Sequence, residues 1–135
     1  MIAALISITS LAAAIQWVYY CRSAVASTKH VEPSGHVLRA VGLANGKPKA
    51  GDFERFLELA RLCPERGKDA AQIRRVATYY SLLRLLARFL GEPLPAVSCW
   101  ARREQRACSH FAAVVLDRRI SCSRDLFRQQ RNDRS

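Results

Sequence analysis

Residues 2–21 read IAALISITSLAAAIQWVYYC, and this stretch decides how the rest of the chain is interpreted. It contains no Asp, Glu, Lys, Arg or His. Twenty helical residues rise by ~30 Å, which is the thickness of the hydrocarbon core of a bilayer. A helix also satisfies its own backbone hydrogen bonds, as lipid requires. We therefore expect residues 1–22 to form a transmembrane anchor.

The residues at the end of this stretch predict its orientation. Trp17, Tyr19 and Tyr20 are suited to the headgroup layer, and Arg22 and Lys29 follow them, whereas no Lys or Arg precedes the stretch. The positive-inside rule then places the N-terminus outside and the rest of the chain in the cytoplasm, at the plasma (inner) membrane of a bacterium. The five cysteines agree with a reducing compartment, because their number is odd and none are spaced as C-x-x-C.

Two other interpretations of the stretch stay open. A cleaved signal peptide would need a basic segment before its apolar region, which is missing, although small residues at 12–14 and 24–26 offer cleavage sites. A buried core helix would account for the polar residues within the stretch, which are Ser7, Thr9, Ser10 and Gln16.

The sequence pattern after the apolar stretch predicts a tether and a helical domain. Residues 23–51 contain Ser, Pro and Gly turn-formers and read as a flexible linker, in which residues 36–43 fit either a short helix or a strand. Residues 52–128 form the domain, with helices expected at about 53–63, at 69–90, and from 99 to 116 or as far as 127. Residues 129–135 are expected to be a basic disordered tail. The predicted fold class is all-α: one transmembrane helix, a tether and a small bundle of about three amphipathic helices.

The second of these helices has the widest apolar face. Apolar residues at helical spacing form a stripe along it, and further apolar residues lie on both sides of this stripe. The residues of the stripe are Ile73, Val76, Ala77, Tyr80, Leu83, Ala87 and Leu90. A face this wide needs two neighbouring helices, or one helix and the bilayer surface. The apolar face of residues 73–90 is therefore our candidate contact for a protein partner.

No pattern in the sequence indicates catalysis. The loop at 42–48 has three residues between its glycines, and Pro48 stands where a phosphate loop needs a hydroxyl. Cys99, Cys108, His110 and Cys122 are suitable zinc ligands but lack the two-residue spacing of zinc sites. We expect no enzyme activity, no cofactor, no metal and no small-molecule substrate.

Arginine is the one residue type whose distribution suggests a function. The chain has 22 Lys and Arg against 11 Asp and Glu, a formal net charge of +11. The possible contacts with an anionic surface are Arg102, Arg103, Arg106, Arg118, Arg119, Arg124 and Arg128. For a tethered chain the nearest anion is lipid, and each basic residue near it contributes about 1 kcal/mol. A solvated basic face without any partner explains the same pattern.

The sequence thus predicts a non-catalytic interaction or scaffold module, integral to the membrane, on its cytoplasmic side. The alternative is a membrane-tethered protein that binds nucleic acid or anionic lipid through its Arg-rich C-terminal region. Nucleic acid is the less expected of these two ligands, because Phe127 is the only aromatic residue in the tail and no helix-turn-helix pattern is present.

Overall fold

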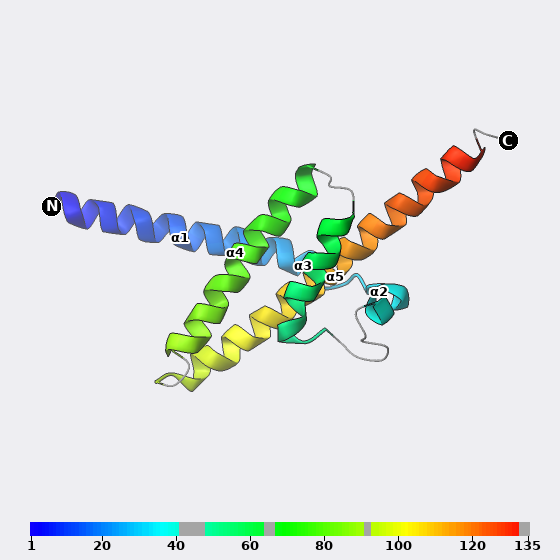
Figure 1. Cartoon of the computed structure of the whole chain (residues 1–135). Helices are drawn as coiled ribbons and strands as arrows, with labels where there is room; N and C mark the ends of the chain where they lie inside the picture. The colour runs from blue at the N-terminus through cyan, green and yellow to red at the C-terminus, as the bar shows by residue number, and fades with distance from the viewer. Residues whose placement is uncertain (41–47, 64–66, 91–92, 133–135) are drawn as a thin grey trace.

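The computed structural model describes residues 1–40, 48–63, 67–90 and 93–132, and most of these residues are helical. The helices are α1 (Ile2–Ala26), α2 (Gly35–Ala40), α3 (Phe53–Leu62), α4 (Gly67–Leu90) and α5 (Pro95–Asn132), with a 3₁₀ turn, η1 (Ala50–Asp52), before α3. The described residues contain no strand. Figure 1 shows a long N-terminal helix followed by a bundle, so the predicted all-α class is confirmed.

Helix α5 is the element against which α4, α3, α2, η1 and the end of α1 all pack. Helices α4 and α5 form an antiparallel pair, and α3 lies along α5 beside it (Figure 1). Pro95 is the first residue of α5, a position where the missing N–H of proline has no helical partner to lose. The short connection before it therefore turns the chain back without breaking either helix.

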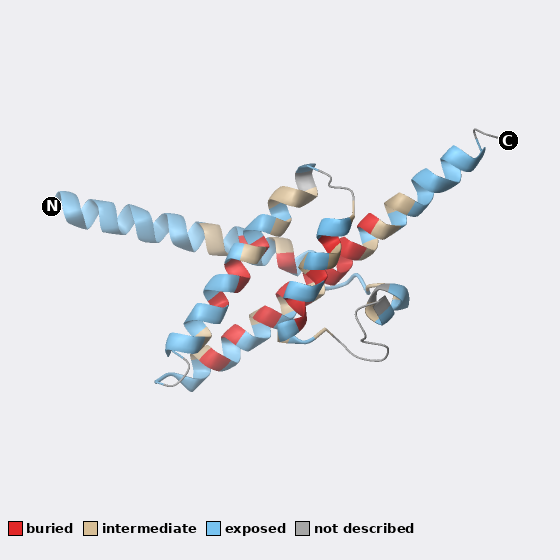
Figure 2. Cartoon of the chain, in the orientation of Figure 1, coloured by how far each residue is buried: buried red, intermediate tan, exposed pale blue. Residues whose placement is uncertain are grey.

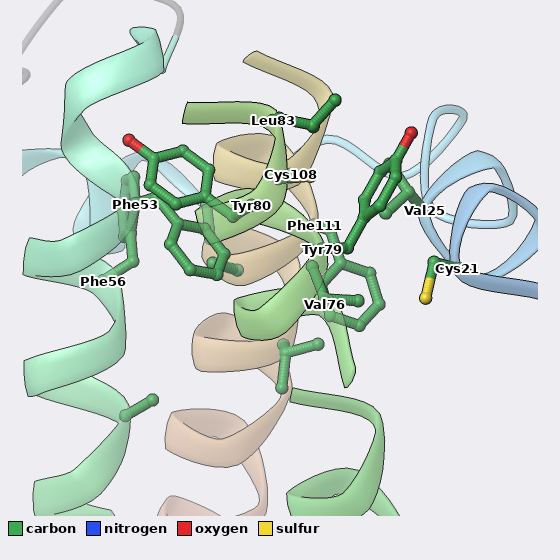
Figure 3. Close-up of a cluster of buried hydrophobic side chains, with 14 of the residues drawn as sticks. Cys21, Val25, Phe53, Phe56, Val76, Tyr79, Tyr80, Leu83, Cys108 and Phe111 are labelled. Atoms are coloured by element: carbon green, nitrogen blue, oxygen red, sulfur yellow. The ribbon is translucent and has the colours of Figure 1, made fainter. Parts of the chain in front are cut away.

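The core lies where α3, α4 and α5 meet. The rings of Phe53 and Tyr80 stack with centroids 4.4 Å apart, and Phe56 and Leu83 are almost fully buried. Figure 3 shows α3 on one side of this cluster and α1 on the other, with α4 and α5 between them. The first part of the predicted α4 stripe is therefore core, because its side chains already have helical neighbours.

Helix α1 differs from the expected anchor in its last two turns. Its first 15 residues, 2–16, are exposed, whereas Cys21 and Val25 are each only 2% exposed. The Trp17 and Tyr79 rings pack edge-on with their centroids 6.2 Å apart, and the Cys21 thiol lies 3.9 Å from the Arg75 carbonyl oxygen. Spacings of four residues put these side chains on one face. The helix therefore passes the boundary expected at residue 22 and ends inside the core.

The other expected boundaries also shift. Part of the expected linker is ordered: α2 is helical, and Ser34 donates from its backbone N–H and its hydroxyl to the Asp117 carboxylate on α5. Helix α5 begins at Pro95 rather than at residue 99 and continues to Asn132, so residues 129–132 are helical rather than part of a disordered tail. The phosphate-loop-like segment at 42–48 lies outside the described residues except for Pro48.

Candidate membrane-facing surface

The exposed half of α1 is the largest apolar feature of the molecule. Ile2, Leu5, Ile8, Leu11 and Ile15 are all more than 60% exposed. Among the described helices, α1 alone is long and apolar enough to span a membrane, and its apolar window is not buried at all. A core helix of this domain would be covered by the other helices, and Figure 2 shows that this half is not. Apolar surface of this extent is unfavourable in water and calls for another environment.

The length of the free part of α1 constrains where the domain would sit. Residues 2–16 number 15 and rise by about 22 Å, which is shorter than the ~30 Å hydrocarbon core. The additional length needed to cross the hydrocarbon core can come only from residues 17–21, whose inner face packs against α4. A bilayer crossed by this helix would therefore reach the surface of the domain itself.

A second apolar surface lies on the C-terminal half of α4. Leu82, Leu85, Leu86 and Phe89 are all exposed, Phe89 by 71%, and they occupy positions i, i+3, i+4 and i+7 of one face. We call these four residues the apolar ridge. The predicted face of residues 73–90 is thus divided: Val76 and its neighbours are packed in the core, and the ridge is what remains uncovered (Figure 2).

The apolar ridge continues the face of α4 that contacts α1. Tyr79 packs on Trp17, and Leu82 and Leu86 follow Tyr79 by three and seven residues on the same side of the helix. On α5, Trp100 precedes Glu104 by one turn, and Glu104 contacts α1 through Arg22. Figure 1 shows the N-terminus of α1 and the α4–α5 connection on the same side of the molecule, with the C-terminal end of α5 on the opposite side.

Glu104 joins three helices by polar contacts at this junction. Its carboxylate lies 3.4 Å from an Arg22 guanidinium nitrogen and accepts a hydrogen bond from the Tyr79 hydroxyl at 3.3 Å. Burial, together with the Glu104 charge, raises the pKa of Tyr79, so this phenol stays protonated and donates. The structure thus pairs Glu104 with α1 and α4.

The seven candidate arginines do not form one surface. Arg102, Arg103 and Arg106 are exposed on the first half of α5, and Arg102 donates to the Ser98 hydroxyl at 2.8 Å. Of the other exposed candidates, Arg118 stands between the buried residues Leu116 and Arg119, and Arg124 and Arg128 belong to the C-terminal part of α5. Figure 1 shows this C-terminal part extending away from α1.

Arg119 is an exception among these seven arginines, because it is only 5% exposed. It follows Cys108, Ala112 and Val115 in the buried register of α5, and its Nη1 donates to the Ala60 carbonyl at 2.8 Å. It therefore does not belong to an anion-binding outer surface. The helical register alone predicts that position 119 is buried. The neighbouring arginines suggested an exposed position instead.

The four residues considered as zinc ligands differ in how far they are buried. Cys99 is exposed, Cys108 is fully buried, and His110 and Cys122 are half-buried. Within the described residues, no three His, Cys, Asp or Glu side chains gather closely enough to hold a metal ion. Burial raises the pKa of the Cys108 thiol to about 12 and lowers the pKa of His110, so both groups favour their neutral forms.

No protein-family model matches this chain, and neither the curated proteins nor the solved structures include one similar to it.

Proposed function

We propose that this protein is a single-pass membrane protein whose helical domain lies directly against the cytoplasmic face of the plasma membrane and acts there as a non-catalytic interaction module. One observation carries the proposal: a single helix is exposed and mostly apolar along its first 15 residues and is built into the domain core along its last turns. The anchor and the domain therefore share one rigid element.

Charge supports the cytoplasmic orientation. Arg22 and Lys29 follow the apolar stretch, and both are exposed. Basic residues close to the end of a transmembrane helix favour the cytoplasmic side. They also attract the anionic headgroups of that leaflet, at about 1 kcal/mol each.

Packing favours a permanent anchor over a cleaved signal peptide. Cleavage at residues 24–26 would remove Trp17 and Cys21 from the domain and expose the buried faces of Val76 and Tyr79. Burying an aliphatic or aromatic side chain stabilises a fold by about 1.5–3 kcal/mol, so the cleaved domain would lose several such contributions.

The second half of α5 is the surface that we assign to the partner. It extends beyond the core, with Leu126 59% exposed and Phe127 72% exposed, between Arg124 and Arg128. Apolar side chains flanked by arginines suit an acidic protein surface with an apolar groove. The apolar ridge, in contrast, is assigned to the bilayer, because it adjoins α1.

A pair of matched variants tests the membrane assignment. Ile8→Arg places a charge in the middle of the apolar stretch, which costs about 3 kcal/mol of insertion free energy. Ser121→Arg places the same charge on an exposed position of α5. After alkaline carbonate extraction, the wild type and S121R should stay in the membrane pellet, and much of I8R should be released. Equal release of all three proteins would contradict the proposal.

Reporter fusions test the orientation. Green fluorescent protein at the C-terminus should fluoresce in the membrane fraction, and alkaline phosphatase at the same position should be inactive. An active phosphatase would show that the domain is exported, and the cytoplasmic assignment would be withdrawn.

Nucleic-acid binding is the second candidate function, and the observation that favours it is the position of Arg124 and Arg128 away from α1. The full chain in neutral detergent should then retard unrelated DNA sequences in a gel, less so as salt increases. Arg124→Gln combined with Arg128→Gln should weaken this binding. Failure to retard DNA at low salt would remove this candidate.

A further inference from the structure

A cavity of ≈ 330 Å³ lies between α3, α4 and α5 and is separate from the apolar ridge. Three arginines from the three helices line it: Arg61, Arg74 and Arg119. The rest of its wall is apolar and includes Leu57, Ile73 and several alanines. Among the described residues, no carboxylate belongs to this wall. We call it the arginine cavity.

The guanidinium of Arg119 is incompletely satisfied within the folded chain. Only 5% of this residue is exposed, Nη1 donates to the Ala60 carbonyl, and the buried Nε has no acceptor. Buried polar atoms are nearly always paired, because an unpaired one loses its water without compensation. A buried positive charge without a counter-charge is less favourable still.

The described part of the chain supplies no counter-charge to this cavity. The two ion pairs that it contains join Arg22 to Glu104 and Arg84 to Glu54, and neither involves a cavity arginine. The cavity is therefore lined by one buried arginine, Arg119, and by two arginines that are exposed, Arg61 and Arg74. Guanidinium groups bind carboxylate and phosphate oxygens through paired hydrogen bonds, and a low local dielectric strengthens these bonds.

We propose that the arginine cavity binds a compact, soluble organic anion, with its carboxylate or phosphate held by the three arginines and its apolar body against Leu57 and Ile73. The volume is near the lower end of the range for small-molecule sites, which excludes a large ligand. The site is formed by the first turns of α4 and the middle of α5, away from the apolar ridge, so a soluble anion is the assigned source rather than a lipid headgroup.

The proposal requires that both the charge and the apolar body contribute to binding. We would titrate the full chain in neutral detergent micelles with phenyl phosphate and benzoate, at constant ionic strength, and follow the melting temperature. Inorganic phosphate and acetate supply the charge alone, and benzyl alcohol supplies the apolar body alone. A ligand that binds the folded state raises the melting temperature progressively with its concentration. Phenyl phosphate or benzoate should do so at concentrations where the three partial probes have no effect.

Neighbouring arginines on α4 provide the matched control. Both Arg74 and Arg75 are exposed, but only Arg74 lines the cavity. Arg74→Gln should weaken phenyl phosphate binding by roughly tenfold or more, the effect of removing one charged hydrogen-bond donor, and Arg75→Gln should leave it unchanged. Equal weakening by both variants would reduce the effect to net charge and overturn the proposal, as would no response to either organic anion. Displacement of phenyl phosphate by phosphatidylglycerol vesicles would overturn the soluble-ligand assignment.

Discussion

Arg119 has unusual surroundings for an arginine, because its side chain is buried without a carboxylate partner. Replacing buried charges by apolar side chains of similar length is often neutral or stabilising by about 1–4 kcal/mol. We therefore expect Arg119→Met, without ligand, to increase the free energy of unfolding by about 1 kcal/mol, even though the hydrogen bond to Ala60 is lost.

Thermal unfolding measures this effect, since ~1 kcal/mol corresponds to a rise of about 4–8 °C for a domain of this size. Arg118→Met, at the exposed neighbouring position, is the control and should change stability by less than about 0.5 kcal/mol. A lower melting temperature for R119M would show that Arg119 stabilises the fold through Ala60, and would weaken the case for an external anion.

Two cysteines of α5 should differ sharply in reactivity. Burial raises the pKa of Cys108 to about 12, so at pH 8 only about one molecule in 10⁴ carries the reactive thiolate. Cys99 lies on the exposed face of the same helix. Iodoacetamide at pH 8 should therefore modify Cys99 and leave Cys108 intact, as read by peptide mass spectrometry. Denatured protein should show both modified. Equal labelling of the two in the folded state would mean that this part of the core opens readily.

At the scale of single elements, α4 follows its sequence pattern closely. The expected helix over 69–90 is observed as Gly67–Leu90, and Val76, Tyr80 and Leu83 of its stripe are buried. A wide apolar stripe bounded by Gly and Pro is a strong local signal. The sequence could not show which part of this stripe would be covered, because that depends on where α3 and α1 pack.

Helix α5 illustrates the opposite case. The sequence pattern predicts a start at residue 99, four residues too late, because the apolar periodicity does not include Pro95, although proline fits the first helical position. Its end was missed because an arginine-rich segment resembles a disordered tail, although Arg is a good helix former. Arg119 was assigned to the surface for the same reason. The arginine cavity itself could not be predicted, since its three arginines come from helices far apart in sequence.

The contact between α1 and the domain depends on Trp17. Its ring packs edge-on against Tyr79, which is 2% exposed. Trp17→Ala should lower the free energy of unfolding by ~1–3 kcal/mol, less than for a fully buried Trp, because Trp17 is only half-buried. Chemical denaturation in neutral micelles measures the change. Tyr20→Ala, at a position 59% exposed, is the matched aromatic control and should have little effect. Similar losses for both variants would mean that α1 is held by the micelle rather than by the domain.

At the scale of the whole molecule, the distribution of apolar surface is more informative than the net charge of +11. The exposed half of α1 extends to the side of the N-terminus, whereas the C-terminal part of α5, which carries Arg124 and Arg128, extends to the other side (Figure 1). One face is thus suited to lipid and the opposite end to a soluble partner. The arginines cannot all serve one anionic surface, as the sequence pattern suggested.

The two tryptophans can determine how closely the domain approaches the bilayer. Trp17 lies at the end of the free part of α1, and Trp100 lies on the first half of α5, 37% exposed. Brominated acyl chains quench only those indoles that reach the lipid. In nanodiscs made with such lipids, Trp100→Phe isolates the Trp17 signal and Trp17→Phe isolates that of Trp100. We expect both signals to be quenched, because the free part of α1 is too short to span the hydrocarbon core unless the domain surface meets it.

Leu86→Lys then tests the apolar ridge directly. A lysine there should be excluded from the hydrocarbon, so the quenching of Trp100 should fall while that of Trp17 is retained. Arg84→Lys, two residues away on the other side of α4 and already charged, is the control and should change neither signal. Quenching of Trp17 alone in the wild type would place the α4–α5 connection away from the bilayer. The apolar ridge would then be free to contact a protein, and the partner would have to be sought on α4 rather than on the end of α5.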